Sequence, residues 1–142
     1  MGKEIFISWS NRYELGLQII DDQHKELVRL TNALHETCCQ GKEFVKSGFQ
    51  TAVQATVDYV GKHFSAEEKI MQQVNYPHIA EHKLEHEKFV KKVLQDVKDF
   101  QEGKTFVPNK FAYFLKDWIL GHIALTDKKL VDYLLKIKTP SA

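Results

Sequence analysis

Apolar residues recur every three or four positions along four long stretches of the chain, which is the period of an α-helix with one buried face. The four stretches cover about residues 21–39, 44–74, 77–101 and 109–136. Asp21 or Asp22 marks the start or first turn of the first stretch, where a carboxylate suits the helix dipole. Gly41 ends that stretch. The residue before a proline avoids the helical region, so Tyr76-Pro77 ends the second, and Pro77 suits the first position of the third.

No sustained strand-like alternation accompanies these helices, and the connections between them are short. Four amphipathic helices joined by short loops predict an all-α fold, an antiparallel up-down-up-down four-helix bundle. We expect a single domain over residues 1–142, with the bundle at 18–136 and a loose polar tail at 137–142. Residues 1–17 lack a helical period and predict an extended N-terminal arm. Its apolar side chains, expected to pack on the bundle, are Ile5, Phe6, Ile7 and Trp9.

Composition and charge narrow the classes of function. The 142 residues carry a net charge of +1, from 20 basic and 19 acidic side chains. Without a basic excess or a polybasic segment, we expect no nucleic-acid partner and no membrane-surface partner. No run of 18 apolar residues predicts membrane insertion, and the first residues show no signal-peptide pattern. The adjacent Cys38 and Cys39 cannot form a disulfide framework, so we expect a reducing, cytoplasmic location.

Each of the four inward stripes carries at least one histidine. The candidate metal ligands are His24 on the first, His63 and Glu67 on the second, His82 and His86 on the third, and His122 and Asp127 on the fourth. Residues four apart on a helix lie about 40° apart in rotation and about 6 Å apart along the axis. His63 and Glu67 therefore share a helix face, and so do His82 and His86. Any single histidine is more simply explained as a buried, hydrogen-bonded side chain, whereas the whole set favours a metal centre.

The other two histidines are poorer candidates. His35 lies three turns, roughly 16 Å, beyond His24, so it is expected in the core or at an interface. His78 falls in the first turn after Pro77, beyond the layer of the others. The spacing between His122 and Asp127 is also irregular, because five residues of an ideal α-helix turn about 140° past a full rotation. We therefore predict a π-bulge, or a break near Leu125-Thr126, that turns Asp127 inward.

The donor set indicates which chemistry such a centre favours. Five imidazoles, two bridging carboxylates and one bridging oxide or hydroxide leave one position open on a pair of octahedral ions. A histidine-rich site donates less charge than a carboxylate-rich one, so it favours reversible oxygen binding over O–O cleavage. Iron suits these ligands, but zinc and manganese also bind them, so the ligands alone leave the metal open.

The ordered set His24, His63-x3-Glu67, His82-x3-His86 and His122-x4-Asp127 resembles the hemerythrin family, specifically the bacteriohemerythrins. The resemblance extends from Trp9 to Tyr133. It implies a non-haem di-iron centre, with two oxo- or hydroxo-bridged iron ions, that binds dioxygen reversibly as a carrier, store or buffer. It also implies that Glu67 and Asp127 bridge the ions. His82, His86 and His122 would complete one iron, while His24 and His63 hold the other, where dioxygen binds.

The same resemblance implies an oxygen pocket lined by Phe64, Trp118, Ile119 and Ile123. Taken singly, each of these side chains is at least as well explained by ordinary core packing. The resemblance leads us to expect leucine at the position where this chain has Ile119. The shape of the pocket is therefore expected to differ. Dioxygen is the expected partner, together with a signalling or oxygen-accepting protein, and the oligomeric state does not follow from the sequence.

Three other functions stay open at this stage. One is an oxygen or redox sensor domain of a signalling protein, because hemerythrin-like domains also occur fused to signalling modules. Another is a di-iron enzyme, such as a peroxidase, a nitric-oxide scavenger or a ferroxidase. A two-zinc hydrolase is the most remote. We expect a binding protein and no enzyme, because no side chain is an evident proton donor dedicated to such chemistry.

Overall fold

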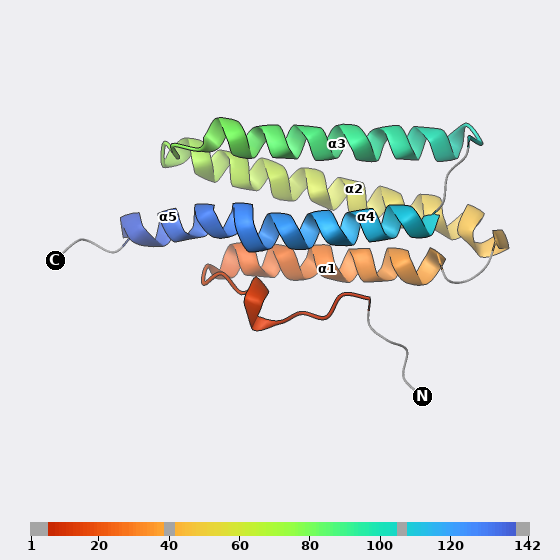
Figure 1. The fold of residues 1–142 in the computed structure, drawn as a ribbon, viewed down its shortest axis with the longest axis horizontal. Helices are drawn as coiled ribbons and strands as arrows, with labels where there is room; N and C mark the ends of the chain where they lie inside the picture. The colour runs from red at the N-terminus through yellow and green to blue at the C-terminus, as the bar shows by residue number, and fades with distance from the viewer. Residues whose placement is uncertain (1–5, 39–41, 105–107, 139–142) are drawn as a thin grey trace.

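The computed structural model describes residues 6–38, 42–104 and 108–138, and it shows four long helical rods packed side by side (Figure 1). The elements are the 3₁₀ turn η1 (Asn11–Tyr13), α1 (Gln18–Cys38), α2 (Lys42–Gln73), α3 (Ile79–Gln101), α4 (Pro108–Gly121), the π-helix η2 (His122–Asp127) and α5 (Lys128–Lys138). The last three elements follow one another without a break and form the fourth rod. The predicted all-α, antiparallel four-helix bundle is confirmed.

The start of α1 is fixed by a side chain from its own first turn. Asp21 lies in that turn, as predicted, although the helix begins three residues earlier, at Gln18. Its carboxylate accepts hydrogen bonds from the backbone N–H groups of Leu15 (2.8 Å) and Gly16 (3.2 Å). Gly16 has a φ of +101°, a conformation that glycine adopts at little cost. Asp21 therefore closes the turn through which the N-terminal arm enters the bundle.

The connection between α2 and α3 differs from the prediction. Pro77 is not the first helical residue of the third rod, because α3 begins at Ile79. The backbone N–H of Ile79 donates to the carbonyl of Tyr76 (3.2 Å), so Pro77 lies inside a tight turn. Asn75 precedes that turn with a φ of +53°, the left-handed conformation that commonly follows the end of a helix.

The described part of the N-terminal arm packs on the bundle, as predicted, and it runs along α1 (Figure 1). Its packing side chains are Phe6, Ile7 and Trp9. The side-chain amide of Asn32 pairs with the backbone of Ile7, accepting from its N–H (2.7 Å) and donating to its carbonyl (3.0 Å). Phe6 stacks on His35 with ring centroids 3.7 Å apart. Ile5, which was also expected to pack here, lies outside the described residues.

The core has an apolar cluster at each end and a polar layer between them. The larger cluster includes Leu34, Phe49, Phe64 and Phe89, and the smaller one includes Ile20, Met71 and Leu130. Along every rod, the candidate ligands lie between residues of these two clusters. This arrangement keeps bulk water away from the polar layer on both sides, which strengthens electrostatic interactions inside it. Within the described ranges, no helix is long and apolar enough to cross a membrane.

Candidate metal centre

All seven candidate ligands lie in the polar layer and are almost inaccessible to solvent. Their exposed fractions range from 0 to 6%. They form two overlapping groups whose potential ligand atoms lie within 4.8 Å of one another. One group contains His82, His86, His122, Glu67 and Asp127, and the other contains His24, His63, Glu67 and Asp127. Neither group includes His35 or His78.

The carboxylate of Asp127 directs one oxygen to each group. Its Oδ1 lies 3.1 Å from Nε2 of His82 and 3.0 Å from Nε2 of His122. Its Oδ2 lies 2.8 Å from Nε2 of His24. Glu67 lies on another side of the same layer, with Oε1 3.3 Å from Nε2 of His86 and 3.5 Å from Nε2 of His63. These two carboxylates therefore have the positions that bridging ligands of two neighbouring cations would need.

Several of these buried polar atoms have no hydrogen-bond partner in the described part of the protein. They include both carboxylate oxygens of Glu67, Oδ1 of Asp127, and Nε2 of His63 and His82. An unpaired buried polar group costs about 1–3 kcal/mol, and more when it is charged. So many in one layer would be a large penalty, which bound cations would remove. Imidazole nitrogens with carboxylate oxygens form a donor set that fits iron.

The inward position of Asp127 depends on the π-helix η2, which spans His122–Asp127. In a π-helix the hydrogen bonds join residues five apart, so His122 and Asp127 come to the same face. The irregular spacing in the sequence predicted this local widening, and the prediction is confirmed. On the opposite side of the segment, Leu125 is 74% exposed. The widening is thus a local change that brings one additional carboxylate into the core.

The protonation of the layer follows from its burial and its two carboxylates. Burial and the nearby Asp127 raise the pKa of Glu67 well above its usual range. Burial acts in the same direction on Asp127, but the neighbouring imidazoles, His122 foremost, outweigh it and hold the pKa of Asp127 well below its usual range. Burial and neighbouring imidazoles lower the pKa of His86 to about 2, which keeps this ring neutral. The raised pKa favours the protonated form of Glu67, and a bound cation would compete with that proton.

The rings of three candidate ligands are oriented by hydrogen bonds that the sequence did not predict. In each, Nδ1 donates to a side-chain oxygen on another helix, which leaves Nε2 facing the polar layer. The pairs are His63 with Gln23 Oε1 (2.6 Å), His86 with Glu68 Oε2 (2.9 Å) and His122 with Glu85 Oε2 (2.9 Å). Each acceptor adjoins a candidate ligand in the sequence, and this adjacency was the one available signal. The pairing itself depends on how the helices are packed.

These acceptors differ in charge between the two groups. The three-histidine group has two carboxylates behind it, Glu68 and Glu85, whereas the two-histidine group has the neutral amide of Gln23. The hydroxyl of Thr126, within the π-helix, also donates to Oε2 of Glu85 (2.7 Å). A carboxylate acceptor makes an imidazole a stronger donor to a metal ion. A cation bound by the three-histidine group would therefore have the more strongly donating imidazoles.

We expect Glu85→Gln to weaken metal binding about tenfold, at the lower end of the range for such outer partners. The amide keeps an oxygen near His122 but removes the negative charge that strengthens this ligand. Competition with a chelator would measure the change. Glu81→Gln is the matched control, because Glu81 is on the same helix with its side chain 76% exposed. Equal loss of metal from both variants would contradict a role for the charge of Glu85.

Apolar and aromatic side chains close the polar layer on the side of the larger cluster. The ring of Phe64 stacks on His86 (3.7 Å between centroids), and the ring of Trp118 stacks on His122 (4.4 Å). Ile119 and Ile123 are buried in the same cluster as Phe64. The four residues that the resemblance implies for an oxygen pocket thus lie together in this cluster, and two of them touch ligand rings directly.

Comparisons with known proteins agree with this geometry. Residues 15–134 match the family model described as the hemerythrin HHE cation binding domain. The chain is 37% identical over 108 residues to a bacteriohemerythrin of Methylococcus capsulatus, covering 76% of this chain and 80% of that protein. It is 34% identical to a bacteriohemerythrin of Pseudomonas aeruginosa, covering 87% and 78%. A crystal structure of wild-type hemerythrin superposes with a TM-score of 0.80 at 33% identity, covering 87% and 93%.

Proposed function

The chain belongs to the hemerythrin family, and from this we propose that it is a non-haem di-iron protein that binds dioxygen reversibly, as a carrier, store or buffer. The observation that supports the proposal most is the pair of overlapping ligand groups that share Glu67 and Asp127. One group has three histidines and the other has two. Two ions of the same kind would therefore differ in how many of their coordination positions the protein fills. The less saturated position has room for a small ligand.

The proposed roles of the chain's own residues follow from their positions. His82, His86 and His122 would hold one iron, His24 and His63 the other, and Glu67 and Asp127 would bridge them. Two ferrous ions supply, when bound, the two electrons that reversible dioxygen binding requires. Gln23, Glu68 and Glu85 hold three of the rings so that Nε2 faces the centre.

The apolar wall supports a binding role over a catalytic one. Phe64 and Trp118 stack on rings of the three-histidine group, and the ring centroid of Phe64 lies 6.0 Å from that of His63 in the other group. Together with Ile119 and Ile123 they would exclude water from the centre, and water is the main route by which protons reach a buried site. Proton delivery promotes irreversible oxidation and peroxide chemistry, so a dry wall favours release of dioxygen unchanged. The hydroxyl of Tyr133 donates to the carbonyl of Val74 (3.4 Å), so this phenol is already engaged with the backbone.

Reversible oxygenation is the direct test of this function. Anaerobically reduced, iron-loaded protein would be exposed to air and then to vacuum while its visible absorption is recorded. We expect about two irons per chain and an absorption band that appears in air and disappears under vacuum over repeated cycles. Irreversible oxidation on first contact would contradict the proposal, as would zinc in the protein as isolated. Fast turnover of peroxide or nitric oxide would favour an enzyme instead.

A further inference from the structure

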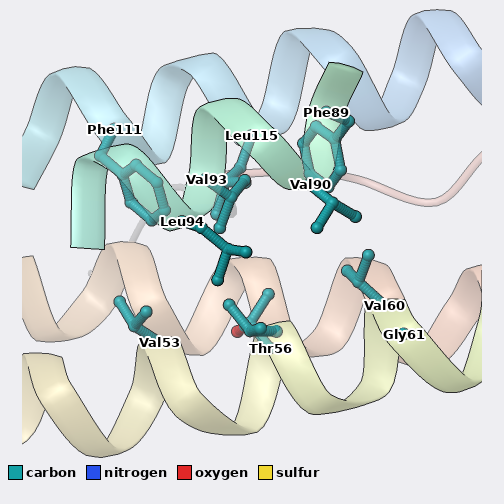
Figure 2. A pocket seen from close by; sticks show the side chains of 11 residues that line it. Val53, Thr56, Val60, Gly61, Phe89, Val90, Val93, Leu94, Phe111 and Leu115 are labelled. Carbon is teal, nitrogen blue, oxygen red and sulfur yellow. The ribbon is translucent and has the colours of Figure 1, made fainter. Parts of the chain in front are cut away.

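A pocket with a volume of about 240 Å³ lies outside the polar layer, between α2, α3 and α4 (Figure 2). Its walls include Val53, Thr56 and Val60 from α2, Phe89 and Val93 from α3, and Leu115 from α4. In Figure 2 the side chains of α2 point across the pocket toward those of α3. None of these residues belongs to the candidate ligand groups, so the cavity is a separate feature of the bundle.

The lining of the cavity selects against polar solutes. Among its lining residues, all within the described part of the chain, Thr56 has the only polar side chain. The hydroxyl of Thr56 already donates to the carbonyl of Ala52 (2.9 Å), so its proton is not available to a guest. An ion or a strong hydrogen-bonding group would lose its hydration here without compensation. The chemistry of the walls therefore suits an uncharged apolar molecule.

The size of the cavity limits what it can hold. The pocket is partly open to solvent, and its volume of about 240 Å³ is enough for a small organic molecule. An apolar cavity of about 150 Å³ in another protein stays dry and binds benzene. Scaled by volume, the present cavity holds about ten non-hydrogen atoms. Gly61 and the half-exposed Leu94 also line it, which gives a guest access from solvent.

We propose that this cavity is a binding site for a small uncharged apolar organic molecule, such as a substituted aromatic ring. The site stands apart from the proposed di-iron function, because its walls contain no candidate ligand. It is nevertheless close to the metal centre. Phe89 lines the cavity and stacks on Trp118 (3.9 Å between centroids), which in turn stacks on His122 (4.4 Å). A guest in contact with Phe89 would thus be linked to the candidate ligand His122 through two rings, those of Phe89 and Trp118.

The test uses isopropylbenzene as the probe and the metal-loaded protein. Binding is measured as the depletion of isopropylbenzene from the headspace of a sealed vial. The control solute is the protonated amine with the same carbon skeleton. A Cβ at Gly61 meets no atom within 4 Å, so this position has room for a side chain, and Gly61→Phe introduces a ring at the mouth of the cavity. Lys62→Phe adds the same ring at the neighbouring exposed position, which does not line the cavity.

We expect saturable binding of isopropylbenzene, at least tenfold weaker binding to Gly61→Phe, unchanged binding to Lys62→Phe, and no binding of the amine. Iron content and helical circular dichroism of both variants would verify that the bundle and the metal centre are intact. Equal binding to Gly61→Phe, or equal uptake of the amine, would overturn the proposal. So would a lack of binding combined with slower oxygen association in Gly61→Phe, because the cavity would then be only a passage for dioxygen.

Discussion

Asp127→Ala is expected to lose both metal ions. Asp127 belongs to both ligand groups, and its two oxygens face different histidines, so its removal affects both positions at once. Removing a partner that merely orients a ligand weakens metal binding about 10–100-fold. Loss of a ligand shared by two ions should therefore exceed about a hundredfold in each position. Iron analysis after gel filtration in the presence of a chelator would measure the loss.

Two further variants separate the carboxylate from the π-helix that positions it. Leu125→Ala changes an exposed side chain in the same segment and should keep both ions. Asp127→Asn keeps the shape of the side chain and removes the charge, so its metal loss would be due to chemistry and not to misfolding. If Asp127→Ala retained two irons per chain, the bridging role of this residue would be wrong.

The position of Asp127 illustrates what the sequence can predict. The helical period of the fourth stretch and the five-residue spacing after His122 cannot both hold in a regular α-helix if both side chains face inward. This conflict predicted either a π-bulge or a break near Leu125-Thr126, and η2 has the π-helical conformation. The bounds of the helices could be anticipated only approximately, because turns and prolines act over a few residues of the chain. The last helix, for example, continues to Lys138, so the first two residues of the predicted loose tail at 137–142 are helical.

Other features depend on contacts that no local pattern specifies. Glu85 accepts from a histidine 37 positions later in the sequence, and Gln23 from one 40 positions later. Which acidic or amide side chain faces which ring is set by the rotation and axial shift of one helix against another. The start of α3 was misplaced because the preference of proline for a first helical position was outweighed by the hydrogen bond that closes a turn around Pro77.

The apolar cavity is a still clearer case of tertiary information. Its lining residues have the same helical period as the residues that fill the core, so the sequence gives no sign that space is left between them. The volume of the cavity is set by the relative positions of three helices and by Gly61, which has no side chain to fill the space. Periodicity therefore predicts which residues face inward, but not how completely they fill the interior.

His82→Ala is expected to remove the ion of the three-histidine group. The ring of His82 is buried, with both nitrogens lacking a hydrogen-bond partner among the described residues. Its Nε2 lies 3.1 Å from Asp127 and 3.5 Å from Glu67, in the middle of the group. Without it, that ion would keep two histidines and the carboxylates, and iron should fall from about two per chain to one or fewer, with at least about a hundredfold loss of affinity.

The matched control is His78→Ala, because His78 precedes His82 by one helical turn and competes with it as a ligand on sequence grounds. Its side chain is 44% exposed, and its nearest acidic partner is Glu81 at 3.7 Å. We expect this variant, like His35→Ala, to retain both irons. Adding free imidazole to His82→Ala should restore part of the iron, since it can occupy the space that the ring leaves. Loss of iron from His78→Ala together with retention in His82→Ala would mean that the ligands of the third helix are wrongly assigned.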